Sequence, residues 1–362
     1  MLSGRGPEAT GPKVAPFDPA DAGLREHFEV SGLQDNVLFG RLREPVRGSI
    51  AALRRWFAER GLVAWVSPEE EGHSIVVRPV PRLAPPRRWV NLLLFALTVL
   101  TTLFVGAFQM GRNPIAAPLE IVYGFPFSLS ILLILGSHEL GHYLVARRLG
   151  VDATLPYFLP VPHPMTGTMG AFIKMRSPVP DKGALVRVGI AGPLVGFLVA
   201  VPVTVVGLAL SRVVEAGPEM AGISLGSSLV FRLLSWLRFG SLPEGQDVML
   251  HPVAFAGWLG FFVTALNLLP AGQLDGGHIV YAIAGRFRKA LGWVVIGALL
   301  LLGRFWLGWP FWAVLIALFG LRHPRPLDTV SPLTALDKWL AVVALVLLVL
   351  TFMPAPFGAV RI

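Results

Sequence analysis

The chain has 362 residues, of which 54% are hydrophobic and only 15% are charged. A soluble domain carries about 25% charged residues, so most of this chain is expected to be solvated by lipid. The net charge of +9 comes from Lys and Arg that mostly flank apolar runs, without a basic stripe and interleaved aromatics, so nucleic acid is not an expected partner. The absence of cysteine excludes a disulfide framework and a thiolate metal site.

The first 83 residues are predicted to lie outside the membrane. Residues 1–19 are rich in Gly and Pro and contain no apolar run, so they are expected to form a disordered tail and not a signal peptide. Residues 20–83 are expected to form a small soluble α/β domain. Apolar residues at helical spacing predict a helix over 49–60, and strand-like runs occupy 62–66 and 74–80.

Apolar runs recur through residues 84–362, which are predicted to form an all-α polytopic membrane domain. A helix needs roughly 20 apolar residues to cross a bilayer core of about 30 Å, so the shorter runs are less certain to span it. Residues 211–250 make a loop too short for an inserted domain of 50 residues or more. The predicted spans are residues 89–109, 125–149, 184–210, 253–269 and 340–353, with a possible hairpin at 291–302 and 306–321.

Clusters of Lys and Arg fall in the segments between these apolar runs. Counting through the spans places every cluster, and the segment 155–182, on the side of the N-terminus. By the positive-inside rule that side is the cytoplasm. The expected location is therefore a multi-pass integral membrane protein with a cytoplasmic N-terminus, in the cell (inner) membrane if the source is bacterial.

The second predicted span contains the sequence His138-Glu139-Leu140-Gly141-His142. Residues four apart on a helix share a face, so His138 and His142 can bind one Zn²⁺ while the neighbouring Glu139 acts as a general base. The alternative is a pair of core histidines that only pack. Each charged group at the bilayer centre costs about 2.5–3.5 kcal/mol, which disfavours ionisable groups without a function.

A third metal ligand is expected from the apolar stretch 266–278. Asp275 is the carboxylate available there, and Pro270 and Gly272 would break the helix before it. Broken helices are tolerated at membrane depth only inside the protein or beside a cavity. The alternative for Asp275 is a loop residue that caps the following helix.

These motifs resemble the site-2 proteases, a family of intramembrane zinc metalloproteases. The family carries H-E-x-x-H on one membrane helix and L-D-G on a later one, and both stand here, the second as Leu274-Asp275-Gly276. The resemblance covers a three-helix core over about 125–286. It implies that His138, His142 and Asp275 bind one zinc per chain and that Glu139 is the base. It also implies that Asn267 could hydrogen-bond the substrate carbonyl or the oxyanion, with a helix–helix hydrogen bond as the alternative.

Two further features bear on this resemblance. The family often has G-P-x-x-N on its third helix, whereas this chain has Gly196 in the last position, so the polar contact is missing or replaced by close backbone packing. Residues 155–180 are apolar and rich in Pro and Gly, with a predicted strand at 170–175. In the family a comparable segment forms a short membrane-associated β element near the active site, where an edge strand could pair with an extended substrate. His163 is expected to be a solvated loop residue, and His278 is a candidate partner of a metal ligand.

The predicted function is an intramembrane zinc metalloprotease that hydrolyses peptide bonds in or near transmembrane segments of membrane-protein substrates. The alternative is a metal transporter or a metal-stabilised membrane receptor, which would use the same ligands without needing Glu139. The scarcity of other His, Asp and Glu in the spans disfavours a transport path. A third possibility is an H-E-x-x-H membrane peptidase with a Glu as third ligand, but no suitable Glu follows in a later span.

Overall fold

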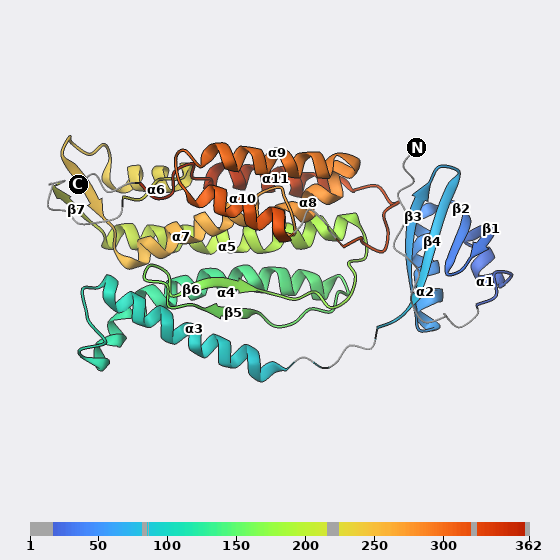
Figure 1. Ribbon diagram of the computed structural model, residues 1–362, viewed down its shortest axis with the longest axis horizontal. Coiled ribbons are helices and arrows are strands. Elements are labelled where there is room, and N and C mark those ends of the chain that lie inside the picture. The colour runs from blue at the N-terminus through green and yellow to red at the C-terminus, as the bar shows by residue number, and fades with distance from the viewer. Residues whose placement is uncertain (1–16, 82–84, 86, 216–223, 320–323, 359–362) are drawn as a thin grey trace. The chain divides into compact units, whose positions relative to one another are not determined.

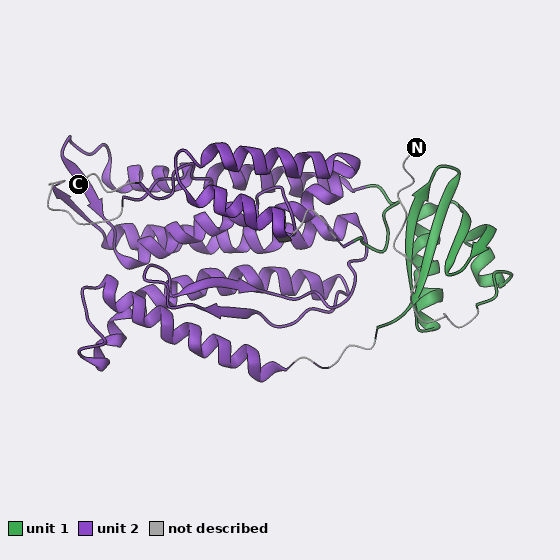
Figure 2. Cartoon of the chain, viewed as in Figure 1, with its two compact units in different colours: residues 1–84, 325–332 green, residues 85–324, 333–362 purple. Residues whose placement is uncertain are grey.

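The structure is a computed structural model that describes residues 17–81, 85, 87–215, 224–319 and 324–358. The chain divides into two compact units (Figure 2): unit 1 comprises residues 1–84 and 325–332, and unit 2 comprises residues 85–324 and 333–362. The predicted tail, residues 1–19, lies almost entirely outside the described residues.

Unit 1 contains an antiparallel four-stranded sheet in the order β1-β2-β4-β3 (Figure 1). Ile50, Leu53 and Phe57 recur every three or four residues along α2 and are buried together with alternate strand residues such as Val66 and Ile75. The predicted helix and two strands are confirmed, while β1, β2 and α1 were not foreseen. The elements are α1 (Ala22–Arg25), β1 (Phe28–Gln34), β2 (Val37–Leu42), α2 (Val46–Glu59), β3 (Leu62–Glu69) and β4 (Gly72–Pro79).

A segment from the C-terminal part of the chain completes this sheet. Val66 of β3 donates its N–H to the carbonyl of Leu327 (2.7 Å), and its own carbonyl accepts from the N–H of Thr329 (3.1 Å). Val330 packs against the unit 1 core. Residues 327–329 therefore cover the edge of β3 through one isolated parallel bridge between Val66 and Asp328, which the sequence analysis did not anticipate.

Unit 2 is mainly helical, and three of its helical segments are long and apolar enough to cross a membrane: Arg88–Gln109, Pro118–Arg148 and Lys182–Leu210. Each predicted apolar run is confirmed as a helix. The helices are α3 (Arg88–Gln109), η1 (Pro118–Gly124), α4 (Phe125–Arg148), α5 (Lys182–Leu210), α6 (Leu229–Phe239), α7 (Pro252–Asn267), α8 (Asp275–Ala284), η2 (Gly285–Phe287), α9 (Arg288–Leu302), α10 (Gly308–Phe319) and α11 (Ala335–Thr351).

Helix α5 lies at the centre of unit 2, in contact with α4, α6, α7, α8 and α11. Its seam with α7 is made of small residues. A Cβ on Gly207 would lie 2.1 Å from the backbone nitrogen of Ala254, and one on Gly257 would lie 2.1 Å from the hydroxyl of Thr204. Small residues let helix backbones approach closely, which is how helices associate where the surrounding lipid is as apolar as their side chains.

A β-hairpin runs beside α3 and joins α4 to α5 (Figure 1). It consists of β5 (Tyr157–Pro160) and β6 (Thr168–Phe172), which confirms a strand in the predicted region. Asn91, near the start of α3, donates to the carbonyls of Leu155 (2.9 Å) and Pro156, whereas Gln109 at its end donates to the carbonyl of Met165 (3.0 Å).

The two anchor residues of α3 are separated by roughly 27 Å at 1.5 Å per residue. The hairpin therefore follows almost the whole length of this helix. The tip of the hairpin, which the sequence analysis expected on the side where α3 starts, thus contacts the other end of α3.

The segment between α5 and α7 holds α6 and a two-stranded sheet of β7 (Arg212–Glu215) and β8 (Gln246–Met249). Ser211 at the end of α5 accepts the N–H of His251, which in turn caps α7. This hydrogen bond ties the end of α5 to the start of α7.

Candidate metal centre

Three side chains from two helices converge inside unit 2. Nε2 of His138 and Nε2 of His142 lie 3.2 Å apart, and Oδ2 of Asp275 lies 3.4 Å from the first and 3.2 Å from the second. Both histidines are buried and Asp275 is largely so. Among the described residues this is the one group of three or more His, Asp or Glu side chains placed to hold a metal ion.

The triangle fits a tetrahedral zinc ion. Zinc–ligand bonds of about 2.0–2.1 Å in tetrahedral geometry separate neighbouring ligand atoms by roughly 3.3–3.4 Å. The three observed separations agree with this value. Two imidazoles and one carboxylate also match the donor set of a catalytic zinc, which keeps a fourth position open.

Helix α4 supplies both histidines because residues 138 and 142 are one turn apart. Asp275 comes from a different local structure. Helix α7 ends at Asn267, the chain turns through Pro270 and Gly272, and α8 begins at Asp275 itself. Gly276 and Gly277 allow this turn, because a Cβ on either would lie within 2.4 Å of the carbonyl oxygens of Leu268 and Gly272 respectively. Gly272 has a φ of +64°, a conformation that favours glycine.

A backbone carbonyl orients one ligand. Nδ1 of His142 lies 2.7 Å from the carbonyl oxygen of Val188 in α5, and donation of the Nδ1 proton to this oxygen leaves Nε2 free to face the metal. Histidine ligands of metals are commonly held by such a bond, which fixes the tautomer and the ring plane.

Glycines of α5 make room for the imidazoles. A Cβ at Gly192 would lie 2.0 Å from Nε2 of His142, and a Cβ at Gly196 would lie 3.0 Å from Nδ1 of His138. A pair of glycines spaced by four on α5 thus faces the pair of histidines spaced by four on α4. This supports close packing at Gly196 in place of the polar contact common in the resembled family.

Glu139, which lies between His138 and His142 in the sequence, is buried. Its carboxylate lies near the backbone N–H of Ile173, just after β6. Neighbouring Lys174 exchanges hydrogen bonds with Thr154 on the other side of the hairpin. Because successive residues of a strand direct their backbone groups to opposite sides, Ile173 presents the outer edge of the hairpin to Glu139.

The other residues singled out from the sequence differ in where they lie relative to the three candidate ligands. Asn267 lies at the site, with Nδ2 3.2 Å from Nε2 of His138. His163 lies in the hairpin turn, where its Nδ1 accepts from the N–H of Met165 (3.3 Å), and is not part of the ligand group. His278 is one turn after Asp275 and its Cβ faces Gly189. The carbonyl of Val188 and the N–H of Ile173 were missed, because backbone groups carry no residue signature.

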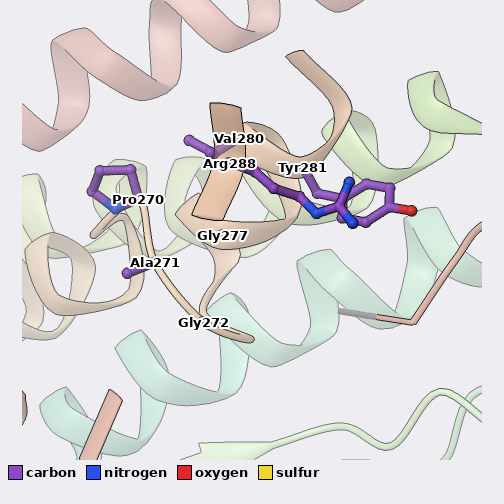
Figure 3. Close-up of a pocket in the computed structure, with 7 residues that line it drawn as sticks. All are labelled: Pro270, Ala271, Gly272, Gly277, Val280, Tyr281 and Arg288. Carbon is purple, nitrogen blue, oxygen red and sulfur yellow. The ribbon is translucent and has the colours of Figure 1, made fainter. Parts of the chain in front are cut away.

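A small cavity of about 20 Å³ lies beside the turn that presents Asp275 (Figure 3). That volume holds about one water molecule. The guanidinium of Arg288 lies over the ring of Tyr281, 4.6 Å from its centroid, along this cavity. The other lining residues are Pro270, Ala271, Gly272, Gly277 and Val280.

Comparison with known proteins places this geometry in a family. The profile of Peptidase family M50 matches residues 126–303, which contain the three candidate ligands and Glu139. No solved structure matches the chain.

Curated relatives extend the match beyond the core. The chain is 30% identical to "Probable zinc metalloprotease EGY1, chloroplastic" of Arabidopsis thaliana, over 89% of its own length and 66% of the relative. It is 32% identical to "Probable zinc metalloprotease EGY2, chloroplastic" of the same plant, over 81% of its own length and 54% of the relative. The EGY1 protein of rice (Oryza sativa subsp. japonica) is 30% identical over 78% of this chain and 53% of the rice protein. The chain thus spans between about half and two thirds of these relatives. From the ligand geometry, the profile match and these relatives together, the chain belongs to peptidase family M50, the site-2 protease family.

Proposed function

We propose that this chain is an intramembrane zinc metalloprotease that cleaves peptide bonds in or near transmembrane segments of membrane proteins. The observation that carries the proposal is the triangle of His138, His142 and Asp275 with sides of 3.2 to 3.4 Å beside a buried glutamate. These three residues would hold one Zn²⁺, which supplies a Lewis acid for the scissile carbonyl when bound.

Glu139 acts as the general base and acid. Its carboxylate takes a proton from the attacking water and delivers the proton to the leaving amide nitrogen. The backbone N–H of Ile173 lies beside this carboxylate and can orient it toward the site. The amide of Asn267 lies beside His138, where it can donate to the scissile carbonyl oxygen as negative charge develops there.

The outer edge of β6 receives the substrate. Proteases bind extended chains, so a transmembrane helix must unwind before it is cut. Since Ile173 directs its backbone toward Glu139, a substrate strand added beside β6 lies next to the base. The apolar side chains of Met169 and Phe172 are exposed on this strand and suit an apolar substrate segment.

The proposed setting is a multi-pass membrane protein with its N-terminus in the cytoplasm. The three long apolar helices support a membrane location, and the basic clusters support the orientation. Unit 1 then lies in the cytoplasm. The absence of cysteine makes the test direct: a cysteine introduced at Ser67 should be labelled by an impermeant reagent only after cells are permeabilised, and labelling in intact cells contradicts this orientation.

The test of the function is Glu139→Gln in the purified full chain. Because Glu139 is not a ligand, zinc content should stay near one per chain, whereas cleavage of a model substrate with a helix-destabilised transmembrane segment should fall. General acid–base catalysis contributes about 10²–10⁴-fold, so residual activity should be about 1% or less. Cleavage near the wild-type rate at full zinc occupancy refutes the mechanism. His163→Ala, in the hairpin turn and outside the ligand group, is the matched control and should keep both zinc and activity.

A further inference from the structure

Helix α5 contacts all three ligands within a stretch of nine residues. The carbonyl of Val188 holds His142, and Gly192 and Gly196 face the two imidazoles. A Cβ at Gly189 would lie 3.0 Å from the backbone carbonyl oxygen of Asp275. The axial position of α5 therefore sets the geometry of the whole triangle, and a shift by one residue would move each contact by about 1.5 Å.

The apolar surface of α5 does not fix that position strongly. Its contacts with α4 and α7 are made largely by glycine, alanine and aliphatic side chains. Dispersion contacts of this kind are individually weak and non-directional. A polar contact with a defined length is better suited to hold one axial register.

Such a contact stands one residue before Val188. Nε of Arg187 donates to Oδ1 of Asp337 in the first turn of α11 at 2.7 Å. Asp337 is 1% exposed. Its other oxygen, Oδ2, accepts from the backbone N–H (2.9 Å) and the hydroxyl (2.6 Å) of Thr334, which caps α11. Asp337 is therefore held by its own helix and presents one oxygen to α5.

The first turn of α5 is shaped to receive this carboxylate. A Cβ at Gly183 would lie 2.6 Å from Oδ2 of Asp337. Glycine at this position lets Asp337 approach the α5 backbone, while Asp181 caps the same turn through the N–H of Ala184. A buried carboxylate that loses its cation is strongly destabilised, so α5 cannot slide away from Asp337 without a large cost.

We propose that Asp337 is a positioning residue for the metal site: through Arg187 it fixes the axial register of α5 and so holds the Val188 carbonyl against His142. This inference rests on the proposed zinc function. It assigns to α11, which contributes no ligand, the role of an axial stop for the helix that supports the ligands.

The experiment measures metal binding in the purified full chain in detergent. Zinc affinity is determined by competition with a chelating dye, and the ligand geometry by the visible spectrum of the Co²⁺-loaded protein. Asp337→Asn and Arg187→Met should each weaken zinc binding about 10-fold or more and change the Co²⁺ spectrum, because partners behind metal ligands commonly contribute 10–100-fold. The double variant should be no weaker than either single variant, since both remove one interaction.

Two further variants separate positioning from general stability. Arg187→Lys keeps the charge and should restore part of the zinc affinity. Arg112→Met is the control. It removes an ion pair with Glu120, just after the end of α3, and should leave zinc affinity and the Co²⁺ spectrum unchanged. If Asp337→Asn does not fold, Thr334→Val, which removes a donor to Asp337 without stranding a charge, should weaken zinc binding by a smaller factor.

Folded Asp337 and Arg187 variants with wild-type zinc affinity and spectrum overturn the inference, even if they melt at lower temperature. If Asp337→Asn does not fold, a Thr334→Val variant with wild-type zinc affinity and Co²⁺ spectrum overturns the inference. These outcomes leave the proposed function standing, because the wild type still binds zinc. A wild-type chain that binds no zinc refutes both.

Discussion

The core of unit 1 and the α4–α5 contact of unit 2 are packed by opposite means. In unit 1 large side chains such as Leu53, Phe57 and Val66 fill the space between α2 and the sheet. At the α4–α5 contact the space is filled by backbone: a Cβ at Gly141 would lie 2.6 Å from the carbonyl oxygen of Ala191. In water the burial of apolar surface drives packing, whereas between membrane helices close approach and polar contacts do so.

The two regions should therefore fail under opposite substitutions. Unit 1 is sensitive to the removal of atoms, and the α4–α5 contact is sensitive to their addition. A single methyl group added at the contact is expected to have a larger effect on the metal site than several removed from unit 1.

The largest effect is expected for Gly192→Ala. Its new Cβ would fall 2.0 Å from Nε2 of His142, so the imidazole and the methyl group cannot both occupy their places. Most of the zinc should be lost, as measured by metal analysis of the purified chain. The matched control is Gly297→Ala in α9, where a Cβ meets no atom within 4 Å and zinc should be retained. A Gly192→Ala chain with full zinc content would show that α4 and α5 can separate freely.

A large but local effect is expected for Leu53→Ala. This side chain is fully buried in unit 1, and such truncations cost about 2–5 kcal/mol. Hydrogen exchange of α2 and β4 should accelerate, while zinc content stays at the wild-type value. Leu33→Ala, at a position that is 46% exposed, serves as the control and should change little. If the variant lost zinc as well as the protection of unit 1 against hydrogen exchange, the two regions would not be packed independently.

The smallest effect is expected for Thr102→Val. The Thr102 hydroxyl lies 2.7 Å from the hydroxyl of Ser128, which links α3 to α4. Hydrogen bonds between membrane helices contribute on average about 0.6 kcal/mol. A double-mutant cycle with Ser128→Ala in a reversible detergent unfolding assay measures this coupling. Among the residues that the structure describes, the Thr101 hydroxyl bonds only to carbonyls of its own helix. Thr101→Val should therefore show no coupling to Ser128, and equal coupling energies for the two threonines would contradict the assignment.

The sequence was most informative where chemistry requires particular side chains. H-E-x-x-H and the Asp275 turn identified the convergent group, because few residue types bind metal and the helical repeat places two of them on one face. The long helices α3, α4 and α5 were located because long apolar runs are distinctive, whereas α6 and α8 were not predicted. Helix α7 ends at Asn267, two residues before the end of the predicted run 253–269, so an apolar run does not define where its helix stops.

Contacts that depend on backbone or on distant pairing were not foreseen. The Val188 carbonyl and the Ile173 N–H exist at every residue, so only the tertiary structure selects them. The hairpin tip was placed by charge alone, while its hydrogen bond to Gln109 depends on how α3 and the hairpin pack. The short run Leu327-Asp328-Thr329 shows no strand alternation that would distinguish it from a connecting loop.

The pairing of this run with β3 also imposes an order in time. Val66 and Thr329 are 263 residues apart, and translation at about 5–20 residues per second separates their synthesis by roughly 13–50 s. During that interval the edge of β3 has emerged but its partner has not been made. Open strand edges are where chains pair wrongly with one another. The last step in assembling the first domain must therefore wait until nearly all of the membrane helices have been synthesised, and the nascent chain must be protected at this edge until then.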